Sequence, residues 1–241
     1  MIYVGIDDTD TIDTRGTNQL AKALVKQVAG RFRCLQIVRH QLLNDPRVPF
    51  TSQNGSASLL FEPLTDGTIS ELIAELRSGM LADFIVGSDP GLCVTDSVPV
   101  AAIEWAHRCQ RELVYRQQAY DIAASHGVFL EGLGGTEDGV IGSLAAIGLA
   151  FERNDGRVVQ MGDWPDDLSG PTPISAVLAR GIDVREIESQ RDVAAGWVDV
   201  GKHLRPNIRA GRYVLFVQPI DPQVRDESDR PEVAYYAVKL K

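Results

Sequence analysis

Four aspartates lie within seven residues near the start of the chain, directly after a short apolar run. They are Asp7, Asp8, Asp10 and Asp13, in the segment GIDDTDTIDTRGTNQLA that begins at Gly5. Like charges at this spacing repel one another and raise each other's pKa, so something must offset the cost. The candidates are a metal ion, a helix N-terminus and water.

Carboxylates flanked by threonines suit a magnesium ion. Mg²⁺ prefers hard oxygen ligands and often bridges a protein to a phosphate, and open α/β sheets tend to bind ligands near the carboxyl ends of strands. Side chains alternate along an extended strand, so we expect Asp8 and Asp10 on one side and Asp7 on the other. These three aspartates are the predicted metal ligands and catalytic residues. A solvated acidic turn, with one aspartate capping the next helix, is the open alternative.

A glycine-rich segment, EGLGGTEDGVIG, precedes a helix of small and apolar residues. Glycines let backbone N–H groups approach a phosphate, and a helix N-terminus favours negative charge. The segment lacks the GxxxxGK[ST] pattern of a P-loop. A phosphate-binding loop and an ordinary structural turn both stay open.

The hydrophobic pattern predicts an α/β (α+β) fold with a ferredoxin-like βαββαβ element. Strands are expected at 2–6, 34–43, 57–61 and 84–86, and helices at 17–32 and 66–80. The Gly/Asp/Pro-containing segment GSDPGLCVTD is expected to be a loop. One long helix is expected over 99–125, followed by a buried helix at VIGSLAAIGLAF and later by short strands. A shift in composition at 162–173 predicts two regions, 1–162 and 163–241.

Bulk composition argues against several classes of protein. With 24 Lys+Arg against 33 Asp+Glu, the net charge of -9 disfavours strong nonspecific binding to nucleic acid. Three scattered cysteines and four scattered histidines provide no zinc-site or disulfide pattern. Without a signal-peptide pattern or a run of about 18 apolar residues, the expected location is cytoplasmic, with no membrane span.

Four stretches together resemble the archaeal tRNA-isoleucine agmatidine synthetases, the TiaS family. In the family's order they are GIDDTD, NDPRVPFTSQNG, GSDPGLCV and GVIGSLAAIG, within residues 1–150. That family activates the ring carbonyl of a cytidine with ATP, and agmatine then displaces the activated oxygen. The resemblance implies a kinase-like nucleotide-binding region beside the ferredoxin-like element, with ATP and Mg²⁺ as cofactors.

The resemblance also implies roles for particular residues. Asp7, Asp8 and Asp10 would hold Mg²⁺ and the ATP phosphates, and the glycine-rich stretch would line the nucleotide site. The expected nucleotide-binding residues are Thr9, Thr11, Gly139, Gly142 and Ser143. The expected substrate-binding residues are Thr51 and Asn54.

The chain departs from the family in three respects. The family's kinase-domain segment after the glycine-rich helix is not recognisable in FERNDGRVVQMGDWPDD. The chain has Gly16-Thr17-Asn18 where the family has a Cys-Thr-Thr stretch. The family's OB-fold and zinc ribbon, which grasp tRNA, are not expected in 241 residues with three cysteines. We therefore expect no tight tRNA binding by the chain alone.

The sequence favours ATP- and Mg²⁺-dependent phosphoryl transfer that activates a carbonyl, amide or hydroxyl oxygen of an unidentified substrate. One alternative is a tRNA-modifying enzyme of the agmatidine-synthetase type that needs a partner. Another is a nucleotide- or metabolite-binding protein without turnover. The choice between a small-molecule and an RNA substrate stays open, and so does the oligomeric state, with a homodimer as one option.

Overall fold

The structure is a computed structural model that describes residues 1–11, 13–48, 54–64, 67–162, 164–220 and 233–239. The chain divides into two compact units, Met1–Glu152 and Arg153–Lys241. The division comes before the strand at 157–161, whereas the composition led us to expect it after residue 162. Within the described residues, no helix combines the length and apolar character needed to cross a membrane.

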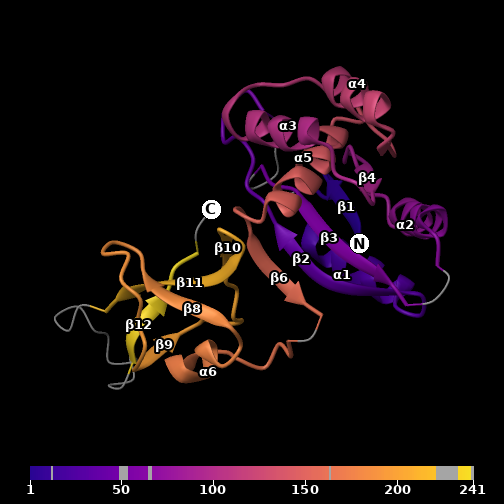
Figure 1. The fold of residues 1–241 in the computed structure, drawn as a ribbon. Helices are drawn as coiled ribbons and strands as arrows, with labels where there is room; N and C mark the ends of the chain where they lie inside the picture. The colour runs from indigo at the N-terminus through magenta and orange to yellow at the C-terminus, as the bar shows by residue number, and fades with distance from the viewer. Residues whose placement is uncertain (12, 49–53, 65–66, 163, 221–232, 240–241) are drawn as a thin grey trace. The chain divides into compact units, whose positions relative to one another are not determined.

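The first unit contains the expected ferredoxin-like element (Figure 1). Its parts follow the βαββαβ order as β1 (Ile2–Asp7), α1 (Thr17–Val28), β2 (Phe32–Arg39), β3 (Ala57–Pro63), α2 (Ile69–Ala82) and β4 (Gly91–Thr95). The sheet order is β4-β1-β3-β2, with every neighbouring pair antiparallel. A further strand, β5 (Phe129–Gly132), pairs antiparallel with β4. The loops at the end of β1 and before β4 are thereby brought side by side.

Local sequence accounts for the two helices of this element. In α1, Leu20, Leu24 and Val28 recur at helical spacing and are all buried. In α2, Thr68 and Glu71 form a capping box, in which each side chain accepts a hydrogen bond from the other residue's backbone N–H. These two helices pack against each other.

A buried helix, α5 (Gly139–Glu152), packs on β1 and β4. Gly5 on β1 permits the close approach, because a Cβ there would overlap the backbone carbonyl of Ser143. The opposite side of α5 packs on α3 (Val100–Arg111) and α4 (Arg116–His126), around the fully buried Trp105. The N-terminus of α5 is consequently fixed beside the carboxyl end of β1.

Two expectations for this unit are wrong. Residues 84–86 do not form a strand, because 84 and 85 are irregular and 86 lies in a turn, and Val86 is 90% exposed. The strand is β4, which lies in the Gly/Asp/Pro-containing segment that we expected to be a loop. The long helix expected over 99–125 is two helices, because Glu112 takes an extended conformation after α3.

The second unit is mainly β-structure. Its elements are β6 (Arg157–Met161), β7 (Pro171–Pro173), α6 (Ile174–Leu178), β8 (Ile182–Glu186), β9 (Trp197–Asp199), β10 (Asn207–Arg209), β11 (Arg212–Pro219) and β12 (Val233–Ala237). They pair in the order β6-β10-β11-β12-β9-β7, with β8 parallel to β11. A small core of mostly valine and isoleucine side chains, including Val184 and Val217, holds the unit together.

Candidate nucleotide and metal site

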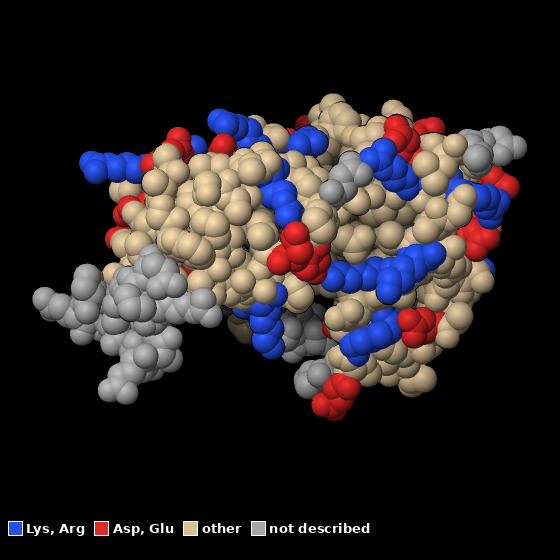
Figure 2. Space-filling view, turned by 90° about the horizontal axis from the view of Figure 1, so that it is seen from below, with Lys and Arg blue, Asp and Glu red and all other residues tan. Residues whose placement is uncertain are grey.

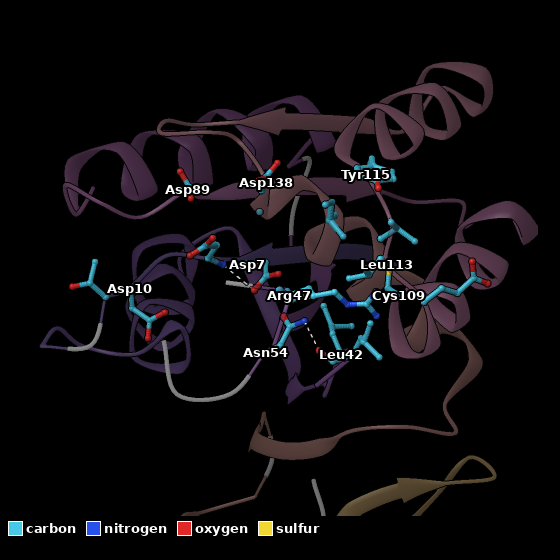
Figure 3. Close-up of a pocket in the computed structure, with 18 of the residues that line it drawn as sticks. Asp7, Asp10, Leu42, Arg47, Asn54, Asp89, Cys109, Leu113, Tyr115 and Asp138 are labelled. Atoms are coloured by element: carbon cyan, nitrogen blue, oxygen red, sulfur yellow. Dashed lines mark hydrogen bonds between the residues drawn. The ribbon is translucent and has the colours of Figure 1, made fainter. Parts of the chain in front are cut away.

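A pocket of about 700 Å³ opens at the carboxyl end of β1 in the first unit. Carboxylates lie at one end of it, namely Asp7, Asp8, Asp10, Asp89 and Asp138, and Asp13 and Glu112 also contribute to the lining. Apolar and aromatic side chains lie at the other end, namely Leu42, Leu113, Val114 and Tyr115. Figure 3 shows this division, with Asp7, Asp89 and Asp138 on one side and Leu113 and Tyr115 on the other. The pocket therefore has a charged end and a mostly apolar end.

Asp7 is the last residue of β1 and packs against α5. Its Oδ1 accepts a hydrogen bond from the backbone N–H of Asp8 at 2.8 Å. A Cβ at Gly142 would overlap the carboxylate, so the missing side chain makes room for Asp7. Burial, followed by the charge of Asp8, raises the pKa of the Asp7 carboxyl to about 7. At neutral pH this carboxylate is therefore costly to ionise without an added positive charge.

Asp8 adopts a left-handed conformation, with φ at 51°. This region is uncommon for residues other than glycine, although Asp and Asn enter it more readily than most. The turn ends the alternation of side chains along β1, so Asp7, Asp8 and Asp10 all line the same pocket. Our expectation that Asp7 would point away from the other two is wrong. Burial, then the charges of Asp89, Asp10 and Asp138, raises the pKa of Asp8 to about 6.

Asp10 is held at the start of α1. The Thr17 hydroxyl donates to Asp10 Oδ1 at 3.3 Å, and burial raises the pKa of the carboxyl. Thr11 lines the pocket as well. Thr9, in contrast, is buried and donates through its hydroxyl to Thr17 at 3.1 Å. Thr9 therefore contacts Thr17, which in turn donates to Asp10. Thr9 is not among the described residues that line the pocket.

Two pocket carboxylates, Asp89 and Asp138, were missed by sequence reasoning. Asp89 connects the surrounding loops, since its N–H donates to the Asp8 carbonyl at 3.1 Å and its own carbonyl accepts from Gly139 N–H at 2.9 Å. Its side chain accepts from Thr136 N–H. The segments GSDPG and TEDG contain these two aspartates, but only the fold brings them to the end of β1.

The glycine-rich segment makes close contacts with the chain itself. Gly139 lines the pocket, but a Cβ there would overlap the Asp89 carbonyl. Gly142 faces Asp7 in the same way. Ser143 is fully buried, and its hydroxyl donates to the Val140 carbonyl at 3.2 Å. These glycines allow α5 to approach β1, and only Gly139 of the three lies on the pocket surface.

The pocket lining also includes Asn54 and Arg47. Asn54 lines the pocket, and its Nδ2 donates to the Leu43 carbonyl at 2.8 Å, which ties two chain segments together. Arg47 crosses the view in Figure 3 and donates twice to Asp45, at 2.8 Å each. Thr51, the other expected substrate-binding residue, lies outside the described residues.

The donor set fits a magnesium ion that a ligand helps to hold. Within the described part of the chain, no three acidic, histidine or cysteine side chains are grouped closely enough to hold an ion alone. Mg²⁺ often takes only one or two protein carboxylates, while phosphate oxygens and water complete its octahedron. The charged end offers oxygen donors, and its carboxylates are partly buried and repel one another. A cation shared with a phosphate would relieve that repulsion.

The raised pKa of Asp7 predicts a pH-dependent gain in stability for Asp7→Asn. The folded state keeps the Asp7 proton up to a pH of about 7, whereas the unfolded chain releases it near 3.8. The parent therefore loses stability as the pH rises through this interval, and the asparagine variant does not. We expect the variant to gain about 4 kcal/mol at pH 8 and almost nothing at pH 4. Urea denaturation across this range checks the effect, and identical pH profiles would contradict it.

No family model and no curated protein matches the chain. Solved structures do. A TiaS–tRNA(Ile2)–ATP complex has a TM-score of 0.55 and 24% identity, covering 61% of this chain and 36% of the TiaS chain. Apo TiaS has a TM-score of 0.54 and 24% identity, covering 61% and 35%. A TiaS–tRNA(Ile2)–AMPCPP–agmatine complex has a TM-score of 0.55 and 18% identity, covering 86% and 52%.

These likenesses define the fold. The chain spans between about a third and about half of the TiaS chains that it matches. One of the three TiaS structures holds tRNA(Ile2) and ATP, and another holds tRNA(Ile2), the ATP analogue AMPCPP and agmatine. The third is the apo form. The mixed α/β architecture seen here is thus one that enzymes acting on tRNA with ATP also adopt.

Proposed function

We propose that the first unit binds ATP with Mg²⁺ and transfers the terminal phosphoryl group to a carbonyl, amide or hydroxyl oxygen of an acceptor. The observation that supports this most directly is the convergence of Asp7, Asp8 and Asp10 with two further carboxylates at one end of a pocket. The pocket volume lies within the range of about 300–1,000 Å³ that is common for small-molecule sites. A carboxylate cluster of this kind has little use without a cation.

In this proposal some pocket residues bind the metal ion and others hold the loop in position. Phosphoryl transfer requires mainly positioning and neutralisation of charge, and the metal ion would supply that neutralisation. Asp8 and Asp10 would hold it, with Asp7 behind them against α5. Asp89 would keep the loop in place through its backbone bonds to Asp8 and Gly139. One of the three carboxylates of Asp7, Asp8 and Asp10 would also accept the proton of an acceptor hydroxyl.

The comparisons favour an RNA acceptor over a small molecule. The TiaS structures that share the fold are described with tRNA(Ile2), ATP and agmatine. Within the broader proposal, the favoured form is therefore an enzyme that activates a base oxygen of an RNA so that an amine can displace it. A binding protein without turnover remains the alternative from a different class.

The chain alone offers little for gripping tRNA. Three arginines of the second unit, Arg205, Arg209 and Arg212, are the candidates for an RNA-binding face. Arg205 pairs with Asp166 and Arg212 with Asp183. Arg209 lies opposite Arg212 in the β10–β11 ladder. Figure 2 shows lysines and arginines interspersed with acidic side chains on the face in view, without a continuous basic surface there. We therefore include in the proposal a separate protein that binds the RNA and presents it to this chain.

Release of ADP tests the proposed function. Incubation with Mg·ATP, a panel of amines and total tRNA, at a tRNA concentration high enough to offset the weak binding expected of the chain alone, should release ADP and incorporate an amine into RNA only when all components are present. Asp8→Asn should abolish both signals. ADP release without RNA, but with a small hydroxyl or amide acceptor, would favour a small-molecule kinase. Absence of ADP under every condition, despite nucleotide binding, would favour the binding protein.

We predict that the isolated chain does not bind total tRNA tightly. Its net charge of -9 opposes association with a polyanion, and the pairing of Arg212 with Asp183 removes one of the few cations that could contact phosphates. A gel-shift titration at physiological salt should give a dissociation constant of about a micromolar or weaker. Nanomolar affinity without a partner would contradict this expectation.

A further inference from the structure

The second unit contains a cationic cluster that the phosphoryl-transfer proposal does not use. Arg157 begins β6, and the strand register places it directly opposite Asn207. Arg205 precedes Asn207 by two residues. The backbone N–H of Val158 donates to the Pro206 carbonyl at 2.8 Å, which holds the two chain segments together. Two arginines from distant parts of the sequence thus become neighbours.

Arg157 is the unusual member of this pair. Among the described residues, none forms an ion pair or a side-chain hydrogen bond with its guanidinium. The residue is only partly exposed, and burial followed by the charge of Arg205 lowers its pKa. An arginine stays charged at any physiological pH, so its partial desolvation and its repulsion from Arg205 are both unfavourable. A bound anion would offset both terms.

Arg205 is already fixed in position beside it. Its two terminal nitrogens donate to the two carboxylate oxygens of Asp166, each at 3.1 Å. His203 contacts the same carboxylate at 3.2 Å. Only 22% of the Arg205 side chain is exposed. The Asp166 carboxylate therefore pairs with Arg205 and His203, and the group formed by Arg157, Arg205 and Asp166 keeps a net positive charge.

We propose that Arg157 and Arg205 form a binding site for a phosphate group, separate in function from the carboxylate pocket. The planar guanidinium presents several N–H donors at spacings that match phosphate oxygens. A phosphodiester of an RNA chain and free inorganic phosphate share this chemistry, and the test separates them.

The test compares two probes on the full chain at low salt. Fluorescence anisotropy follows binding of a short labelled oligouridylate, and NMR titration follows inorganic phosphate. Arg157→Gln should weaken binding about tenfold, while Arg157→Lys should retain part of it. For the oligonucleotide, the logarithmic salt dependence should become shallower by about one unit. Loss with the oligonucleotide alone identifies a phosphodiester site, whereas loss with inorganic phosphate identifies a site for the free anion.

Arg185→Gln is the matched control, because Arg185 is in the same unit and already pairs with Asp192 at 2.9 Å. It should bind both probes as the parent does. Asp166→Asn removes the negative charge beside Arg205 and should strengthen binding, which keeps the test decisive even if Arg157→Gln fails to fold. Parent-like affinity for both probes in Arg157→Gln, or no gain in Asp166→Asn, would overturn the proposal.

Discussion

Mg·ATP affinity is expected to fall by about a hundredfold or more in the Asp8→Asn/Asp10→Asn double variant. Each lost contact between a carboxylate and a metal or phosphate-bound ion is worth ~1.5–3 kcal/mol, or about ten- to a hundredfold in affinity. The fold should survive, because asparagine tolerates the left-handed backbone of Asp8 about as well as aspartate does. Removal of two carboxylates with raised pKa should also stabilise the folded state near neutral pH.

The control for this variant is Asp96→Asn/Glu104→Gln. Both residues are exposed in the first unit, neither lines the pocket, and the change in net charge is the same. Calorimetry with Mg·ATP should give parent-like affinity for the control and a large loss for the Asp8/Asp10 variant. Equal affinities in the two variants would show that the acidic loop does not hold the nucleotide.

Gly142→Val is expected to destabilise the protein by about 3 kcal/mol or more. The new side chain would start at a position that overlaps the Asp7 carboxylate and lies 3.0 Å from a methyl carbon of Leu42. Overpacking of a well-packed interior typically costs about 1–3 kcal/mol, and a β-branched residue in a helix adds to that cost. The carboxylate must also move, so nucleotide binding should weaken even where the variant stays folded.

Thermal and urea denaturation give the stability, and calorimetry gives the nucleotide affinity. Gly142→Ala should show a smaller loss in both. Gly30→Val is a useful control, because Gly30 is exposed with open space where its Cβ would lie. If Gly142→Val matches Gly30→Val in stability and in Mg·ATP affinity, then α5 does not constrain Asp7.

Much of the first unit could be predicted from sequence because its signals are local. The apolar spacing of Leu20, Leu24 and Val28 fixes α1, and Thr68 with Glu71 marks the start of α2. The errors arose where tertiary contacts overrule composition. The Gly, Asp and Pro residues around β4 predicted a loop. The strand forms there because it pairs with both β1 and β5.

The candidate site was predictable only in part. Asp7, Asp8 and Asp10 are adjacent in sequence and reach the same pocket. Their arrangement was not predictable, because it depends on the left-handed turn at Asp8. Asp89 and Asp138 join them only through the fold. Composition also cannot separate a glycine that contacts a ligand from one such as Gly142, which makes room for another part of the chain.

The central claim is that the carboxylate end of the pocket binds ATP through a divalent cation. Calorimetric titration of the parent protein with ATP, once in excess Mg²⁺ and once in EDTA, tests it most directly. The account predicts clear binding with Mg²⁺ and almost none in EDTA. Without a bound cation, the ATP phosphates would be repelled by Asp7, Asp8 and Asp10. Equal binding in EDTA, or no binding in Mg²⁺, would contradict it.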